Sequence, residues 1–283
     1  MNIIEIENVS YRYSVGTPYE KVALDNVSIG FEKNKITGLI GHTGSGKSTL
    51  VQMLNGLIRP ESGRVLFDGK DIWEKPKQIG KLRFKVGLVM QYPEYQLFEE
   101  TVKKDISFGL RNMGITSEEE IDEKVRKAAE IVGLAPETLE KSPFDLSGGQ
   151  KRRASIAGVI AMEPEVLVLD EPAAGLDPEG RESIFKVIDT YRRTNNATVI
   201  IVSHSMEDMA KWCDNIVVMS DTKIVMSGEC DTVFARGEEL AQIGLNIPQI
   251  TRLLMILKKE GLNINDKLYT VDAAEKAIAE LFE

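Results

Sequence analysis

One glycine-rich segment combines residue types and a spacing that can do chemistry. It matches the pattern G-x-x-x-x-G-K-[ST] at Gly41, Gly46, Lys47 and Ser48. The whole segment comprises Gly41, His42, Thr43, Gly44, Ser45, Gly46, Lys47, Ser48 and Thr49. An apolar run precedes it and a helical pattern follows, which is the context that the pattern requires. The glycines let backbone N–H groups turn towards phosphate oxygens, Lys47 supplies a point charge, and the Ser48 hydroxyl can ligate Mg²⁺. The segment therefore predicts a nucleotide phosphate site with a magnesium ion.

A glycine-rich turn that binds nothing is the alternative for this segment. Ordinary residue frequencies give a chance match of on the order of one per cent in a chain of this length, before context is required. We therefore favour phosphate binding. The pattern occurs in kinases, GTPases and many ATPases, so it predicts the class of ligand and leaves the reaction open.

A pair of carboxylates follows a second apolar run. Residues 166–169 are Val-Leu-Val-Leu, and Asp170 and Glu171 come next. The two carboxylates therefore follow the carboxyl end of a predicted strand, and ligands bind at the edge of a parallel sheet where the carboxyl ends of its strands lie. We expect Asp170 to hold magnesium, directly or through water, and Glu171 to orient and deprotonate an attacking water. A solvated acidic turn ahead of Pro172 is the alternative, but a buried strand rarely ends in paired charges without a counter-ion.

A histidine follows a third apolar run at the same predicted edge. His204 comes directly after residues 198–203 and is one of 2 histidines in the chain. Taken alone it reads as an ordinary residue at the end of a strand. Beside the phosphate loop and the carboxylates, it is a candidate sensor of the γ-phosphate.

The apolar runs predict the elements that position these groups. Residues 36–40, 166–169 and 198–202 are continuous apolar runs, typical of parallel strands covered on both faces by helices. Residues 3–9 and 27–31 alternate, which predicts short, partly exposed antiparallel strands. The fold class is therefore α/β, with a mostly parallel core and an N-terminal antiparallel part.

Two mainly helical regions complete the predicted organisation. Helices are indicated across a charged insertion at about 92–161, with Ser117 at one helix start. Helices are also predicted near Pro248 and Thr270. We divide the chain into a nucleotide-binding domain at 1–232 and an extension at 233–283.

Composition narrows the function classes. The chain has 283 residues, with 35 basic and 44 acidic ones, and its net charge of −9 argues against binding nucleic acid through a general cationic surface. Cys213 and Cys230 have no metal-ligand spacing, and we expect reduced thiols, with their pairing left open. The start lacks a basic and apolar leader, and no run approaches the ~18 apolar residues that would span a bilayer. A membrane role would act through a partner.

The segment that begins at Leu146 resembles the signature motif of ATP-binding cassette (ABC) ATPases. Its residues are Leu146, Ser147, Gly148, Gly149 and Gln150, followed by Lys-Arg-Arg and a helical pattern. A serine hydroxyl and glycine amides at a helix N-terminus present donors and a positive dipole end to an anion. A simple helix cap is the alternative for Ser-Gly-Gly alone, and the phosphate loop and carboxylates on either side argue against it.

The resemblance to ABC ATPases extends in order along the chain. It implies that Tyr13 stacks on adenine, that Gln91 is the glutamine shared by the nucleotide and metal sites, that 175–177 form the D-loop, and that His204 is the switch histidine. It also implies a dimer that sandwiches two ATP molecules, because the signature of one subunit closes over the phosphate loop of another. The bound species are then ATP and Mg²⁺.

Within this superfamily, three segments resemble the ATPases of energy-coupling factor (ECF) transporters and cobalt importers, and most of all the second of their two ATPases. These segments are 91–102, 148–153 and 171–178, and Ala173 departs from the Ser or Thr of many ABC proteins. The resemblance implies a second, related ATPase, with a heterodimer favoured over a homodimer, a transmembrane coupling protein, and a small membrane protein that captures a vitamin or metal ion. The chain would lie on the cytoplasmic face of the membrane, with its extension contacting the other ATPase.

Two other functions stay open from the residues alone. A soluble ABC ATPase acting on nucleic acid or the ribosome usually carries two cassettes or long coiled-coil insertions, and neither is present. A regulatory module without turnover conflicts with intact Glu171 and His204. We also expect the acidic surface around Glu94, Glu99 and Glu100 to meet basic residues on a coupling helix of the membrane partner, with a solvated acidic loop as the alternative.

Overall fold

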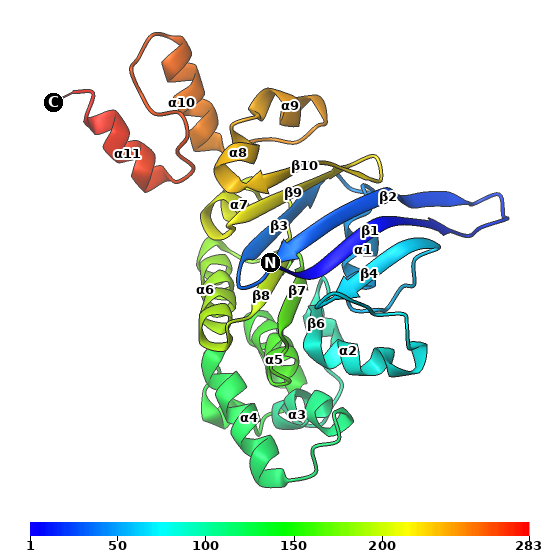
Figure 1. Cartoon of the computed structure of the whole chain (residues 1–283). Coiled ribbons are helices and arrows are strands. Elements are labelled where there is room, and N and C mark those ends of the chain that lie inside the picture. Colours follow the sequence, from blue (N-terminus) through cyan, green and yellow to red (C-terminus); the bar gives the residue numbers. More distant parts are fainter. Residues whose placement is uncertain (283) are drawn as a thin grey trace.

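Two β-sheets organise the computed structural model, which describes residues 1–282 (Figure 1). The larger sheet has six strands in the order β10-β9-β3-β8-β7-β6. Its neighbours are parallel except β10 against β9. The strands are β3 (Ile36–Gly41), β6 (Val86–Val89), β7 (Val166–Asp170), β8 (Thr198–Val202), β9 (Asn215–Ser220) and β10 (Lys223–Glu229). The three continuous apolar runs thus lie in β3, β7 and β8, and the prediction of parallel strands is confirmed.

The second sheet is antiparallel and has four strands in the order β2-β1-β4-β5. Its strands are β1 (Asn2–Tyr13), β2 (Lys21–Glu32), β4 (Ser62–Phe67) and β5 (Lys70–Asp71). β1 and β2 are antiparallel as predicted, but each has 12 residues, so the expected short strands were wrong. Asn8 and Asn26 have positive φ, and the register shifts nearby. These irregularities interrupt the alternation of apolar and polar residues in the sequence, so the alternating pattern extends over only part of each strand.

The larger sheet is buried on both faces, but by different elements. One face packs against α5 (Gly148–Ile160) and α6 (Pro178–Asn195). The other packs against α1 (Lys47–Leu54) together with the antiparallel sheet. The expectation of helices on both faces is therefore right only in part, because on the second face β1 and β2 share the apolar cover with α1.

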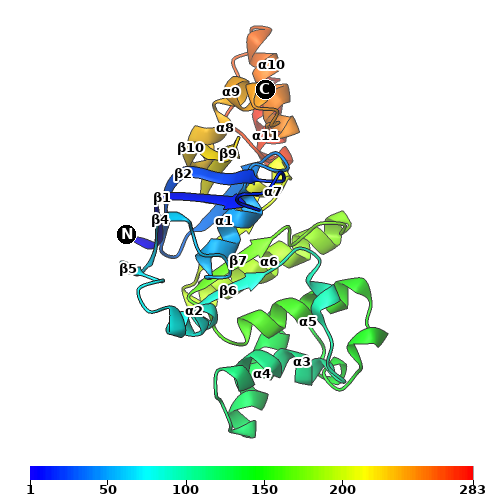
Figure 2. The ribbon, with the colours of Figure 1, turned by 90° about the vertical axis from the view of Figure 1, so that its right-hand side faces the viewer.

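The region between β6 and β7 is helical, as predicted, and lies at the opposite end of the molecule from the C-terminal helices (Figure 2). It contains α3 (Val102–Asn112), α4 (Glu118–Ile131), α5 and short 3₁₀ turns at Pro93–Gln96, Pro136–Thr138 and Pro143–Asp145. The Ser117 hydroxyl accepts a hydrogen bond from the Glu120 N–H over 3.3 Å. Ser117 therefore begins α4 as an N-cap, as its sequence context predicted.

The remaining helices were only partly predicted. They are α2 (Ile79–Lys85), α7 (Met206–Trp212), α8 (Cys230–Phe234), α9 (Gly237–Gln242), α10 (Gln249–Lys259) and α11 (Val271–Ala279). Pro248 and Thr270 are the N-caps of α10 and α11, and these two helices share a small apolar cluster around Leu254. Cys213 and Cys230 are free, buried thiols. Within residues 1–282, no helix has the length and apolar character needed to cross a bilayer.

Candidate functional site

The phosphate loop connects the end of β3 to the start of α1. Gly41 and Gly46 have φ of 156° and 104°. A Cβ on Gly46 would lie 2.4 Å from the Ala23 carbonyl oxygen, and one on Gly41 would lie 2.3 Å from that of Met219. Both the backbone conformation and the close packing therefore require glycine at these positions.

Lys47 lies inside this loop and is 6% exposed. Its ammonium donates hydrogen bonds to the carbonyl oxygens of Gly41 over 2.7 Å and His42 over 2.9 Å. Burial lowers the pKa of Lys47, and the charges of Glu171 and Asp170 act in the opposite direction. The positively charged ammonium group of Lys47 thus lies within the loop, at the base of a cleft.

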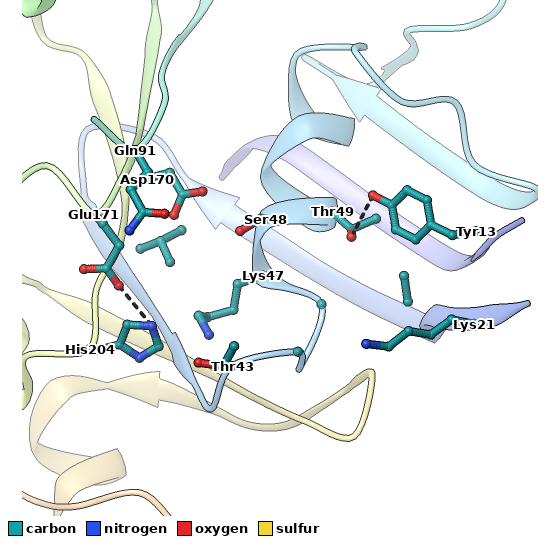
Figure 3. Close-up of a pocket in the computed structure, with 14 residues that line it drawn as sticks. Tyr13, Lys21, Thr43, Lys47, Ser48, Thr49, Gln91, Asp170, Glu171 and His204 are labelled. Carbon is teal, nitrogen blue, oxygen red and sulfur yellow. Dashed lines mark hydrogen bonds and ion pairs between the residues drawn. The ribbon is translucent and has the colours of Figure 1, made fainter. Parts of the chain in front are cut away.

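The loop forms one wall of a cleft of about 360 Å³ (Figure 3). The residues that line it are Tyr13, Lys21, Ala23, Thr43, Gly44, Gly46, Lys47, Ser48, Thr49, Gln91, Asp170, Glu171, Val202 and His204. The cleft therefore brings together the phosphate loop, the carboxylate pair, Gln91, His204 and Tyr13, which are far apart in the sequence.

Glu171 is held in an unusual conformation at the end of β7. Its φ is 52°, a left-handed value that is uncommon for a residue with a Cβ. Its N–H donates to the Val202 carbonyl oxygen over 3.0 Å, which ties it to the end of β8. Its Oε1 atom lies 3.3 Å from His204 Nε2, and its side chain is 13% exposed. This geometry directs the carboxylate towards His204 and the cleft (Figure 3).

Burial changes the proton affinities of these groups. Burial, assisted by the neighbouring charge of Asp170, raises the pKa of Glu171 to about 7. The pKa of Asp170 is also raised by burial, against the effects of Ser48 and Lys47. Burial and the charge of Lys47 lower the pKa of His204. Glu171 can therefore exchange a proton near neutral pH, as a general base requires.

An aromatic ring and a second lysine lie across the cleft from Glu171 and His204 (Figure 3). The Tyr13 hydroxyl is 3.2 Å from Thr49 Oγ1, and the residue as a whole is 39% exposed. Lys21 is the strand partner of Tyr13 in the β1–β2 pairing and extends over the phosphate loop. A flat ring and a cation at this end can contact a base and its nearest phosphate.

Several predicted site residues lie outside the cleft. Ser45 is fully buried, and its hydroxyl has no hydrogen-bond partner within residues 1–282. The His42 ring turns away from the cleft, with Nε2 3.4 Å from Ser220 Oγ. Gly41 does not line the cleft, and its carbonyl oxygen accepts a hydrogen bond from Lys47. Gly41, His42 and Ser45 therefore shape the phosphate loop through its backbone.

The signature segment also lies away from the cleft of its own chain, at the N-terminus of α5. The Ser147 hydroxyl accepts from the Gln150 N–H over 3.3 Å, and the Gln150 side chain accepts from the Ser147 N–H over 3.0 Å. This capping box orders the helix start. Ser147 and Gly148 are exposed, and Gly149 and Gln150 are half-buried. The structure does not bring these four residues to the phosphate loop.

Oxygen donors suitable for Mg²⁺ gather beside the loop. The Ser48 hydroxyl, the Gln91 amide and the Asp170 carboxylate all face the cleft. Mg²⁺ prefers a few hard oxygen ligands, completed by phosphate oxygens and water. Within residues 1–282 there is no cluster of three or more His, Cys, Asp or Glu side chains that could hold a metal by themselves. The donor set therefore fits a metal that arrives with a nucleotide.

Sequence reasoning missed three residues of the cleft and one behind it. Lys21, Ala23 and Val202 line the cleft, and the buried Arg152 contacts the segments that lead into it. Lys21 lies beyond the irregularity at Asn26, which interrupts the alternation of residues 27–31, so that alternation does not lead to it. The sequence alone carries no sign for Arg152 either.

A phosphate loop between a central strand and a helix, with paired carboxylates at the end of another parallel strand of the same sheet, defines a P-loop NTPase. The antiparallel sheet, the helical insertion and the capped Ser147–Gln150 segment define its ATP-binding cassette class. A sequence profile described as ABC transporter matches residues 24–174. The fold class predicted from the sequence is thereby confirmed.

The chain is similar over almost its whole length to curated ATP-binding proteins. It is 53% identical over 279 residues to energy-coupling factor transporter ATP-binding protein EcfA2 of Clostridium perfringens, covering 98% of each chain. It is 52% identical over 281 residues to EcfA2 of Clostridium acetobutylicum, covering 99% of this chain and 98% of that protein. The chain belongs to the energy-coupling factor family of ABC transporter ATP-binding proteins, and it is an ATPase.

Solved structures agree with this assignment. The structure of cbiO1 from Clostridium perfringens, described as part of the ABC transporter complex cbiONQ, superposes with a TM-score of 0.76 at 39% identity, covering 90% of this chain and 99% of that one. A dimeric post-hydrolysis structure of the ATP-binding cassette MJ0796, bound to ADP and Pi, gives 0.72 at 25% identity, covering 80% and 98%.

Proposed function

We propose that this chain is the ATP-hydrolysing motor subunit of an ECF-type ABC importer and that its cleft is half of a composite site. The placement of Ser147 to Gln150 carries the proposal. These residues form an ordered helix start at which Ser147 and Gly148 are exposed, and none of the four lines the chain's own cleft. A helix start of this kind can bind an anion. Such a helix end is suited to the nucleotide of a second, related ATPase, which would in turn complete the cleft of this chain.

The residues of the cleft divide the work of hydrolysis. Tyr13 would stack on the base, and Lys47 and the loop N–H groups would hold the β- and γ-phosphates. Ser48, Asp170 and Gln91 would hold Mg²⁺, which neutralises phosphate charge when bound. Glu171 would take the proton of the attacking water, and His204 would contact the γ-phosphate. Closure of the dimer would exclude bulk water from this arrangement.

A groove on the helical region is the proposed docking site for the transmembrane coupling protein. It is about 320 Å³ and is lined mainly by apolar groups, including Leu97, Phe98, Phe108 and Met162. Phe98 is 59% exposed and Phe108 is 45% exposed, with their rings packed edge to face. We propose that an amphipathic helix of the coupling protein lies here, with its apolar side against these rings.

The expected acidic surface near this groove needs correction. Glu94 is paired with Arg152 at 2.7 Å, and its side chain is 16% exposed. Glu100 is paired with Lys104 at 2.5 Å. Burial and internal pairing therefore remove Glu94 from the surface and neutralise Glu100, which leaves Glu99 as the acidic group of that set without an ion pair within residues 1–282.

The extension 233–283 is the proposed contact with the second ATPase. Leu253 and Ile256 on α10 are 44% and 51% exposed, next to the small core that α10 shares with α11. Leu253 and Ile256 are three residues apart and so lie on one side of α10, and contiguous exposed apolar side chains of this kind mark subunit contacts. Through its partners the chain would lie at the cytoplasmic face of the membrane and drive uptake of a vitamin or a metal ion captured by a small membrane protein.

Affinity purification of the full chain from detergent-solubilised membranes tests this function. We expect a second ATPase and two integral membrane proteins to co-purify, and ATP hydrolysis by this complex to be indifferent to added RNA. A matched preparation with Phe98→Asp should retain the second ATPase and lose the membrane proteins. Purification of the wild-type chain without membrane proteins, or with RNA-stimulated hydrolysis, would favour the soluble ABC ATPase instead.

A further inference from the structure

A buried arginine on α5 joins three segments behind the cleft. The Arg152 side chain is 4% exposed. Its Nε and Nη2 atoms donate to the Glu94 carboxylate over 3.1 and 2.7 Å. Its Nη1 atom donates to the carbonyl oxygens of Ala174 over 2.6 Å and Pro172 over 3.3 Å. One planar guanidinium thus bonds in two directions at once, which a lysine ammonium on a flexible stem cannot reproduce.

The two segments that Arg152 contacts lead directly into the cleft. Glu94 lies three residues after Gln91, and Ala174 lies three residues after Glu171. The Ala174 N–H donates to the Glu171 carbonyl oxygen over 3.1 Å, which closes a tight turn. Each of the two segments therefore begins at a residue that lines the cleft and is bonded to Arg152 three residues later.

The turn at Glu171 needs such support. A left-handed φ of 52° is unfavourable for a glutamate and persists where the surrounding structure holds it. The Val202 carbonyl oxygen fixes the Glu171 N–H. In the part of the chain that the structure describes, Arg152 is the side chain that donates hydrogen bonds to the carbonyls of Pro172 and Ala174.

The pairing with Glu94 makes this support rigid. A bidentate contact between guanidinium and carboxylate compensates for the burial of both charges and fixes their relative orientation. Burial of Glu94 acts to raise its pKa, but hydrogen bonding by Arg152 keeps that pKa below its ordinary value. The Ser155 hydroxyl, one turn further along α5, donates to the Pro93 carbonyl oxygen over 2.9 Å. The segment after Gln91 is therefore tied to α5 at two points.

We infer that Arg152 is a positioning residue for ATP hydrolysis. It holds the Glu171 turn and the Gln91 segment in a fixed relation to the start of α5, where Ser147 lies. This role rests on the proposed function, because it acts through Glu171 as the base. In the described residues 1–282, Arg152 forms no hydrogen bond with the phosphate loop, so its loss should lower kcat and leave ATP affinity unchanged.

The test compares Arg152→Gln with a matched control in the assembled complex. Arg192 is half-buried, with 23% of its side chain exposed, pairs with Asp189 at 2.8 Å and donates to the Asn34 carbonyl oxygen. Within residues 1–282 it forms no hydrogen bond with either cleft segment. We expect Arg152→Gln to lower kcat by about tenfold or more, since small displacements of reacting groups have large effects on rate. The Kd for ATP of the full chain should stay within about twofold, and Arg192→Gln should change neither quantity by more than about twofold.

Two further variants separate positioning from general stability. Arg152→Lys should recover less than half of the wild-type kcat, because one ammonium cannot hold both segments. Glu94→Gln, which keeps the side-chain shape, should lower kcat less than Arg152→Gln, and the double variant should be no slower than Arg152→Gln alone. Glu94→Gln, which keeps Arg152, also gives a reading if Arg152→Gln reduces the yield of folded chain.

The outcomes distinguish this role from the function on which it rests. An active wild-type complex with an unchanged kcat in Arg152→Gln, or a Kd for ATP that rises in parallel with the loss of kcat, would overturn the positioning role alone. A loss in Arg192→Gln equal to that in Arg152→Gln would assign the effect to stability and overturn it too. A wild-type complex that does not hydrolyse ATP would overturn the proposed function and the positioning role together.

Discussion

Replacing Glu171 by glutamine should stabilise the nucleotide-free chain, and more strongly at higher pH. The carboxyl is largely buried beside Asp170, and its pKa is raised from 4.5 to about 7. The folded chain therefore binds this proton more tightly than the unfolded chain. That stability is fully present below pH 4.5 and is lost as the pH rises through about 7. Glutamine resembles the protonated acid at every pH.

The size of the effect follows from the two pKa values. The difference between 4.5 and about 7, at about 1.4 kcal/mol per pH unit, corresponds to about 3 kcal/mol at pH near 8. At pH near 5 the advantage of Glu171→Gln should shrink to about 1 kcal/mol, because the unfolded carboxyl is then partly protonated. In a chain of this size the larger gain should raise Tm by about 6 °C.

Urea or thermal unfolding of the isolated chain, followed by circular dichroism near pH 5 and pH 8, measures this difference. Glu163→Gln is a matched control of opposite sign. Hydrogen bonds from Lys124 and Lys127 lower the pKa of Glu163, so its stabilising effect is present above the ordinary pKa and is lost as the pH falls. Glu163→Gln should therefore be less stable than wild type near pH 8. Equal stability of Glu171→Gln and wild type at both pH values would refute the reasoning that burial disfavours the ionised form of the Glu171 carboxyl.

Four further outcomes are expected. Lys47→Ala should abolish measurable ATP binding by isothermal titration calorimetry, and unchanged binding would remove the phosphate-loop assignment. Lys21→Gln should weaken ATP and ADP binding severalfold and leave adenosine unaffected, whereas an equal loss for adenosine would contradict a phosphate contact. The kcat/KM for ATP should rise with pH through about 7 as Glu171 ionises, and a flat profile between about pH 6 and 8 would count against it as the base. Ser147→Glu should leave ATP binding by the isolated chain intact and reduce hydrolysis at the partner's site in the complex, and full activity there would argue against a composite site.

The central sheet was predictable because its buried strands are simple in composition. β3, β7 and β8 are covered on both faces, so their residues form continuous apolar runs. β9 and β10 were not predicted, although β9 is buried along most of its length. The antiparallel strands were recognised in part, because the irregularities at Asn8 and Asn26 reverse the pattern of inward and outward side chains.

The cleft was predictable where chemistry restricts residue type. Gly46, Lys47, Asp170 and Glu171 stand in patterns that few other requirements produce. The left-handed conformation of Glu171 and the positions of the Arg152 and Lys21 side chains depend on long-range packing, which no local sequence pattern records. The charge of Glu94 was misread for the same reason, because its partner Arg152 lies far along the sequence.

Hydrolysis of ATP by the isolated chain and by its complex with the second ATPase tests the central claim most directly. Both preparations should bind ATP. We expect hydrolysis to be slow in the isolated chain, to rise strongly on pairing, and to fall by about 10²–10⁴-fold at this chain's site when Glu171 is replaced by glutamine. Equal turnover per site in the isolated chain and the complex, or near-normal turnover at this site with Glu171→Gln, would contradict it.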